Sequence, residues 1–289
     1  RAGDIGKANE SRTRKESILR GLRGLLKVQN MVDQIAPDVI TQISHENYWD
    51  MPNPGCDIAA VKHAVTFHIP PNTNHGNRDV WMIAQGKEPR WTFDTPQERQ
   101  EEFIKGCKVA REVMYEHRAL PLRCMAFYAL MTINDENNSL TPQIQDRQVC
   151  SLLMGAPFLF AGDLATLTEE NINHYAKRFK LVKRLQNEYD IYRHFQFSGV
   201  PAPTDTDWHW WGKLNKDSHG AVVVMRGSAG NQRRIINIPW VKADKKYRVR
   251  ACFAEKELGT FTGKELQEDA IKLYLPVHGQ EILEIAPSK

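Results

Sequence analysis

The chain has 289 residues, 41% of them hydrophobic, which is enough for one large domain or two of ordinary size. No run of about 18 apolar residues occurs, so the sequence predicts no membrane-spanning segment. Basic and acidic residues nearly balance at 39 and 35, for a net charge of +4. This balance does not favour a nucleic acid as the partner.

The cysteines and histidines do not form the pattern of a metal site. The five cysteines are odd in number and widely spaced, and no Cys-x-x-Cys pair occurs among Cys56, Cys107, Cys124, Cys150 and Cys252. The ten histidines are scattered along the chain. We therefore expect buried free thiols, structural or surface histidines, and neither a metal nor a cofactor.

The first two thirds of the chain alternate between helix and strand patterns. Pro96 stands in the first turn of one predicted helix, and Thr168 is the expected N-cap of the longest one. In chain order, the predicted elements are a helix from 16 ended by Pro37, a strand at 38–44, a turn and helix at 53–67, a short apolar run at 78–85, a helix at 95–117, a strand at 123–133, a helix from 143, a strand at 157–163 and a helix at 168–192.

This alternation predicts βαβ units and a parallel sheet. About four units fit into residues 1–196, whereas an eightfold barrel needs about 250 residues, so the count indicates half a barrel or a smaller open sheet. Residues 197–289 contain short β-rich runs separated by turn residues at the spacing of an antiparallel sandwich. The predicted fold class is therefore α/β followed by all-β.

Several acidic residues follow predicted strands, where parallel α/β folds gather their chemistry. Aromatic residues that stack on sugar rings, together with paired carboxylates, are typical of a sugar-cleaving site. Structural roles remain open, because Asp94 is also a good helix N-cap, Asp57 and Asp163 suit helix starts or turns, and tryptophans are commonly core residues. The residues in question are His45, Glu46, Trp49, Asp57, Trp81, Trp91, Asp94, Asp135, Glu136 and Asp163.

Three stretches resemble the α-galactosidase (melibiase-like) glycoside hydrolases. "MGAPFLFAGDLATLTEENINHYAKRFKLVKRL" resembles the last barrel strand and helix of that family, with Asp163 at the strand end. "RWTFDTPQERQEEFIKG" is similar to its sixth-strand segment, and this likeness implies that Asp94 is the general acid/base. "NPGCDIAAVKHA" resembles the fifth-strand loop and implies that Cys56 and Asp57 approach the sugar.

The resemblance implies the last four βα units of a (β/α)8 barrel followed by a β-sandwich, acting on a carbohydrate substrate. The family's nucleophile, an Asp at the end of the fourth strand, has no counterpart in this chain. Half a barrel also exposes parallel sheet edges, so we expect a partner: the N-terminal half of the barrel, from the same precursor or a companion chain. If the run at 78–85 is the sixth strand instead, Asp94 is only a helix cap.

A rival interpretation is a non-catalytic carbohydrate-binding or assembly subunit. It would use the aromatic residues of "DWHWWGKLN", namely Trp208, Trp210 and Trp211, as a ligand surface. We expect these tryptophans to be packing residues instead, because large aromatic side chains are mostly buried. A nucleic-acid-binding α/β protein is a third interpretation, supported only by the mildly basic charge.

Overall fold

The computed structural model describes residues 14–39, 42–43, 66–69, 95–116, 125–127, 135, 138–154, 164–197, 206–268 and 271–288. Within these ranges, helices and short parallel strands come first and antiparallel strands follow. None of the described helices is long and apolar enough to cross a membrane.

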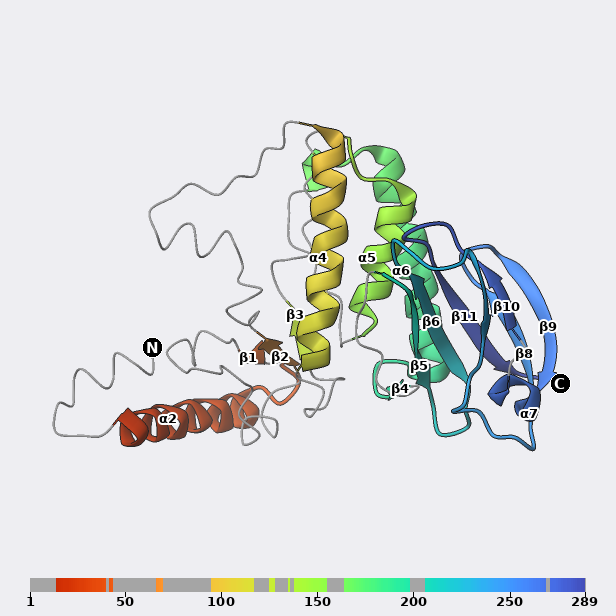
Figure 1. Ribbon diagram of the computed structural model, residues 1–289. Helices are drawn as coiled ribbons and strands as arrows, with labels where there is room; N and C mark the ends of the chain where they lie inside the picture. Colours follow the sequence, from red (N-terminus) through yellow and green to blue (C-terminus); the bar gives the residue numbers. More distant parts are fainter. Residues whose placement is uncertain are drawn as a thin grey trace.

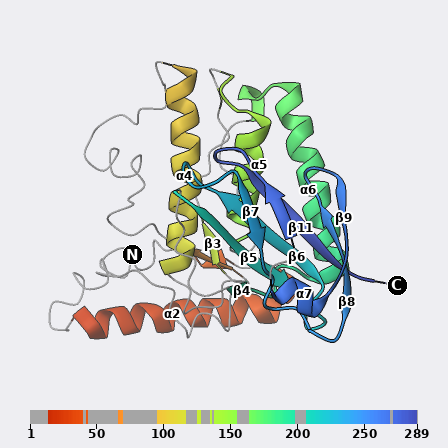
Figure 2. The ribbon, with the colours of Figure 1, turned by 45° about the vertical axis from the view of Figure 1, so that its right-hand side comes forward.

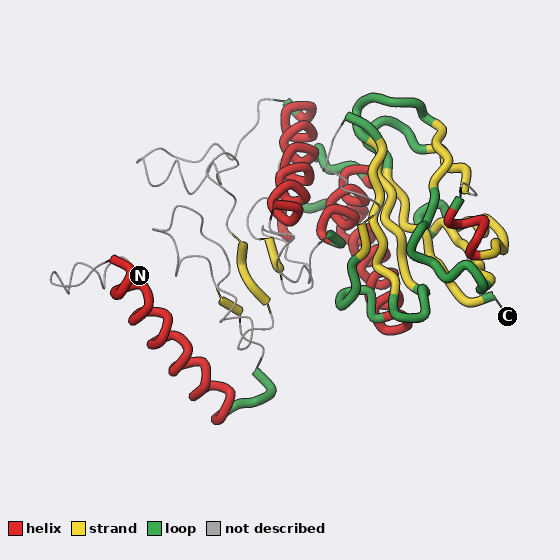
Figure 3. The backbone as a smooth tube through the Cα atoms, turned by 60° about the horizontal axis from the view of Figure 1, so that its bottom comes forward, coloured by secondary structure: helices red, strands yellow, loops and turns green. Residues whose placement is uncertain are grey.

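Three helices stand side by side between two groups of strands (Figure 1, Figure 3). They are α4 (Pro96–Glu116), α5 (Pro142–Leu152) and α6 (Glu169–Tyr189). The starts of α5 and α6 follow from local sequence, because Thr141 accepts the backbone N–H of Ile144 and Thr168 accepts that of Asn171. A further helix, α2 (Arg14–Ile35), lies on the side of the parallel strands (Figure 2).

Three short strands form a parallel sheet in the described part of the chain. They are β1 (Gln42–Ile43), β2 (Thr66–Ile69) and β3 (Met125–Phe127), in the order β1-β2-β3. The register pairs Gln42 with Thr66 and Phe67 with Met125. The strands therefore lie in chain order, as successive βαβ units place them.

The C-terminal strands are antiparallel throughout the described residues. A six-stranded sheet has the order β4-β5-β6-β11-β8-β9, and a two-stranded ladder joins β10 to β7. Helix α7 (Gly263–Gln267) follows β9. The strands are β4 (Gln196–Phe197), β5 (Trp208–Leu214), β6 (Gly220–Arg226), β7 (Arg233–Ile236), β8 (Lys246–Ala251), β9 (Lys256–Thr262), β10 (Ile271–Tyr274) and β11 (Gln280–Pro287).

Strands β5, β6 and β11 of the six-stranded sheet are buried on both faces. One apolar cluster joins the helices to the sheet: Val149 of α5 and Leu185 of α6 pack with Trp211 and Val223, and none of the four exposes any surface. The second cluster contains Ile236 of the two-stranded ladder, packed with residues of β6, β8 and β11. Strand β6 is buried along its whole length because it contributes to both clusters.

The described helices α2, α4, α5 and α6 and strands β1 and β3 lie where the sequence indicated, whereas the predicted apolar run at 78–85 and strand at 157–163 lie outside the described residues. The short helix α7 was not predicted, and two further differences follow. The helix predicted at 53–67 is wrong at its end, since Thr66 and Phe67 begin strand β2, and the β-branched and aromatic residues of this stretch suit a strand. Strand β5 is missing from the prediction. Its burial continues on both faces, so "WHWWGKL" lacks the apolar–polar alternation of a one-sided strand.

Candidate functional site

The residues predicted to form a sugar site lie outside the described part of the chain. Their positions at strand ends therefore stay predictions, and the same holds for His45, Glu46 and Glu136. The predicted site residues are Trp49, Cys56, Asp57, Trp81, Trp91, Asp94 and Asp163.

The helix that follows Asp94 has a capping residue other than Asp94. Thr95 Oγ1 accepts the backbone N–H of Glu98 at 3.2 Å, and the Glu98 carboxylate accepts the backbone N–H of Thr95 at 3.2 Å. These two bonds form a capping box at the start of α4, with Thr95 at the N-cap. The alternative prediction that Asp94 is the N-cap of this helix is therefore wrong.

One strand-end carboxylate, Asp135, has a structural role. Its two oxygens accept the backbone N–H groups of Ser139 and Leu140, each at 2.6 Å, and its side chain is almost fully buried. Its own backbone N–H donates to Thr166 Oγ1 at 3.2 Å. Asp135 therefore fixes the loop that leads into α5, and both of its carboxylate oxygens are engaged in this role.

The three tryptophans of the rival interpretation are packing residues. Trp211 is fully buried, and Trp208 is 5% exposed with its Nε1–H donating to the carbonyl of Asn231. Trp210 is half-buried and donates to the carbonyl of Asn237. All three tryptophans thus pack in the apolar clusters, so the prediction of packing is confirmed for them and the binding-subunit interpretation is not favoured.

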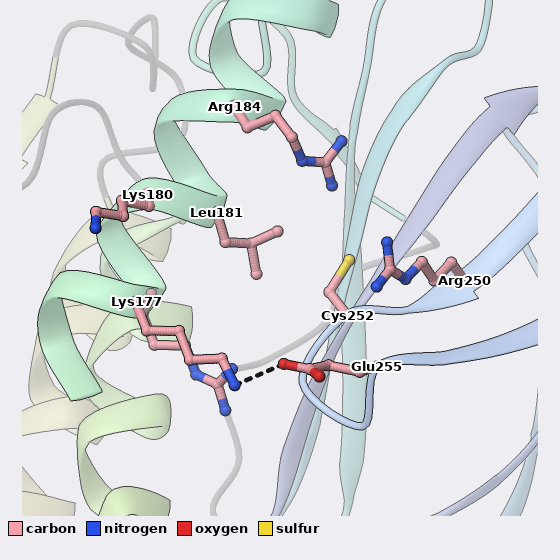
Figure 4. Close-up of a pocket in the computed structure, with 8 residues that line it drawn as sticks. Lys177, Lys180, Leu181, Arg184, Arg250, Cys252 and Glu255 are labelled. Atoms are coloured by element: carbon pink, nitrogen blue, oxygen red, sulfur yellow. Dashed lines mark ion pairs between the residues drawn. The ribbon is translucent and has the colours of Figure 1, made fainter. Parts of the chain in front are cut away.

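A cavity of about 280 Å³ lies between α6 and the turn that joins β8 to β9 (Figure 4). The residues on one face of α6 and those of the β8–β9 hairpin line it together: Lys177, Arg178, Lys180, Leu181, Arg184, Arg250, Cys252 and Glu255. We call it the basic cavity. Lys177 Nζ lies 2.6 Å from Glu255 Oε1 across its mouth.

Carboxylates behind the basic cavity hold its walls in place. Glu281 accepts the backbone N–H groups of Phe253, Ala254 and Ile282 at 2.7, 3.1 and 2.9 Å, and burial nevertheless raises the pKa of its carboxyl. Glu284 accepts Arg184 Nη1 and Nη2 at 2.8 and 2.7 Å. Both carboxylates are thus engaged in structural bonds.

Cysteine and metal chemistry find no support in the described residues. Burial, followed by the charges of Glu284 and Glu281, raises the pKa of Cys252 to about 12, so its thiol stays protonated at neutral pH. Cys107, Cys150 and Cys252 are buried and free, which confirms the prediction for these three. No group of three or more His, Cys, Asp or Glu side chains in the described ranges could hold a metal ion.

The basic cavity was not predicted from the sequence. Lys177, Lys180 and Arg184 stand at the i, i+3 and i+7 positions of α6, which is the signal for a basic helix face. Such a face is usually solvated. This helix face and Arg250 line the same cavity only because α6 packs near the β8–β9 hairpin, and no local sequence pattern predicts that packing.

No family model matches the chain, and no characterised protein matches it by sequence. Solved structures do match by fold. The GH36 α-galactosidase AgaB from Geobacillus stearothermophilus is 13% identical with a TM-score of 0.58, over 95% of this chain and 32% of that chain. An α-galactosidase from Lactobacillus brevis is 10% identical with a TM-score of 0.56, over 92% of this chain and 32% of that one.

A third match, the GH27 β-L-arabinopyranosidase from Geobacillus stearothermophilus, is 10% identical with a TM-score of 0.50, over 96% of this chain and 55% of that chain. This chain spans only about a third of the length of the GH36 enzymes that it matches. At these identities the likeness concerns the fold. The resemblance predicted from the sequence is thereby confirmed: the chain has the fold of about one third of a GH36 α-galactosidase.

Proposed function

We propose that the chain is the C-terminal part of an α-galactosidase-like retaining glycoside hydrolase that cleaves a terminal α-glycosidic bond. Residues 1–196 would be the second half of its (β/α)8 barrel and residues 197–289 a β-sandwich. The fold similarity carries the proposal, since it extends over more than nine tenths of this chain. The three parallel strands in chain order are the expected remnant of a barrel wall.

The general acid/base of this proposed enzyme is Asp94. Thr95 and Glu98 form the capping box at the start of α4, so the helix does not require Asp94 as its cap. The residues proposed to line the sugar are Trp49, Cys56, Asp57, Trp81, Trp91 and Asp163. They follow predicted strands, where barrel enzymes carry their sites.

A retaining enzyme needs two carboxyl groups about 5–5.5 Å apart, one to protonate the leaving oxygen and one to attack the anomeric carbon. We propose that the attacking carboxylate belongs to a part of the barrel that is not among these 289 residues. That part would be joined to this chain in a longer precursor or supplied by a companion chain. It would also cover the exposed edge of the parallel sheet.

The mass of the particle that contains this chain tests the assembly. Mass spectrometry under denaturing and then native conditions should find a second polypeptide, or a chain longer than 33.2 kDa. A particle of this chain alone, inactive on aryl α-galactosides, would contradict the proposal because a nucleophile would be lacking.

Asp94→Asn in the complete enzyme tests the proton-transfer role. Turnover of substrates with poor leaving groups should fall on the order of 10²–10⁴-fold, whereas activated aryl glycosides should suffer much less, since they need little protonation. Thr95→Ala is the matched control, because it weakens the helix cap by about 1 kcal/mol without touching the proton donor. If both variants lose activity equally on all substrates, Asp94 is not the acid.

A further inference from the structure

The basic cavity joins two elements that are far apart in the chain. Lys177, Lys180, Leu181 and Arg184 project from one face of α6, and the β8–β9 hairpin supplies the opposite wall. Five of its eight lining side chains are cationic, and Glu255 is the sole carboxylate among them. None of the residues proposed for the sugar site lines it, so its role is separate from the proposed function.

Three of the five cations are neutralised by nearby carboxylates. Lys177 pairs with Glu255, Arg178 with Asp146 and Arg184 with Glu284. The other two, Lys180 and Arg250, have no hydrogen bond or ion pair within the described ranges. Arg184 also faces the carboxylate of Glu188, so the five cations and their four carboxylate partners carry a net charge of +1.

Arg184 projects from α6 on one wall, and Arg250 extends from the opposite wall toward Cys252 (Figure 4). Arg184 uses three of its N–H groups, one for Glu188 and two for Glu284, which leaves two of the five that a guanidinium carries. Arg250 keeps all of its donors. Lys180 points away from Cys252 in the same view and contributes only its charge.

Contacts within the protein hold the walls of the cavity together. Arg178 lies over the ring of Phe253 at 4.1 Å, so that the helix holds the hairpin turn. Glu281 fixes the same turn through the backbone N–H groups of Phe253 and Ala254. A site held in this way loses little conformational entropy when a ligand binds.

We propose that the basic cavity binds the phosphate group of a small phosphate monoester, through Arg250 and the free N–H groups of Arg184. The net positive charge of the lining residues and their partners favours an anionic group in the cavity. Guanidinium groups bind phosphate oxygens in a two-point geometry that ammonium groups cannot reproduce. The apolar floor formed by Leu181 and Cys252 gives room for a small organic group attached to the phosphate.

The test measures the binding of inorganic phosphate to the full chain by isothermal titration calorimetry, at constant ionic strength set with chloride. Sulfate tests a second tetrahedral dianion, and acetate tests a monoanionic carboxylate. We expect phosphate and sulfate to bind at one site and acetate to bind at least tenfold more weakly. Equal binding of acetate, or no phosphate binding above the chloride background, overturns the proposal.

Arg250→Gln should weaken phosphate binding at least tenfold. Lys256→Gln is the matched control, because it removes one exposed positive charge from the same hairpin and should leave the affinity unchanged. Arg250→Lys keeps the charge but loses the two-point geometry, and should weaken binding severalfold. If Arg250→Gln does not fold, the phosphate affinity of Arg250→Lys tests the site instead. Equal affinity in the wild type and the folded Arg250 variants contradicts the site.

Discussion

Arg178 and Asp146 form a two-point ion pair that joins α6 to α5. Arg178 Nε lies 2.6 Å from Asp146 Oδ1, and Nη2 lies 2.9 Å from Oδ2, while their side chains are only 8% and 12% exposed. His174 Nε2 lies 2.7 Å from the same Oδ1. The pair is therefore an enclosed charge network, and removing one member leaves the other charge buried.

Arg178→Ala should destabilise the protein by about 3–5 kcal/mol, because the carboxylate of Asp146 would lose its buried counter-charge. Arg193→Ala is the control, since Arg193 lies 3.4 Å from Asp190 in a pair whose side chains are 72% and 39% exposed. An exposed pair of that kind contributes about 0–1 kcal/mol. Urea denaturation followed by circular dichroism measures both. Equal losses would show that the Arg178 pair behaves as a surface pair.

The buried imidazole of His209 should make stability depend on pH. Its burial, and then the charges of Arg111 and Arg147, lower the pKa of His209 well below its ordinary value. As pH falls below about 6.5, the unfolded chain takes up a proton that the folded chain refuses, so stability decreases with acidification.

His209→Phe isolates this effect, because phenylalanine keeps the stacking on Trp211, whose ring centre lies 5.8 Å from that of the imidazole. The free energy of unfolding, measured between pH 7.5 and 5.5, should fall less steeply in this variant than in the wild type. Parallel pH profiles of the two proteins would count against the assignment.

Gly220 and Gly24 should respond in opposite ways to substitution by alanine. Gly220 has a φ of +148°, and an added Cβ would lie 2.1 Å from the carbonyl oxygen of Lys213. Because the backbone would have to shift, Gly220→Ala should lower the free energy of unfolding by several kcal/mol. An added Cβ at Gly24, inside α2, has nothing within 4 Å. Gly24→Ala should therefore stabilise by about 0.5–1 kcal/mol. Melting temperatures of the two variants check both signs.

Leu185→Ala should lower stability by about 2–5 kcal/mol, because Leu185 is fully buried in the cluster that α6 shares with the sheet. Ile235→Ala is the control on β7, where the isoleucine side chain is 46% exposed, and should change stability by less than 1 kcal/mol. Denaturant midpoints give the comparison. A loss at Ile235 as large as that at Leu185 would mean that burial does not set these energies.

Local signals predicted the four longer described helices well, but not the short α7. The Thr168 cap and the acidic first turn predicted the start of α6, and Pro96 in the first turn predicted that of α4. The sequence analysis did not predict strand β5, because both of its faces are buried, one against helices and the other against the two-stranded ladder. Amphipathic periodicity disappears from a strand that has no solvent face.

The predicted site rests on a different kind of inference. The ends of different strands come together only in the folded chain. Sequence spacing alone could therefore indicate Asp94 and Asp135 as candidates, but could not tell a catalytic carboxylate from a structural one. Asp135 proved to bind two backbone N–H groups four and five residues ahead. The N-cap of α4 is Thr95, which bonds Glu98 and lies one residue after the predicted Asp94, and both residue types are good caps.

The apolar cluster shared by α4, α5, α6 and the six-stranded sheet limits how this molecule can be cut and recombined. A chimaera that takes its sheet from one enzyme and its last helices from another would bring together two surfaces that were never selected to interlock. Residues such as Val149, Leu185, Trp211 and Ile282 would then face foreign neighbours at zero exposure. The natural unit of exchange is thus a cassette that begins before α4 and ends after β11.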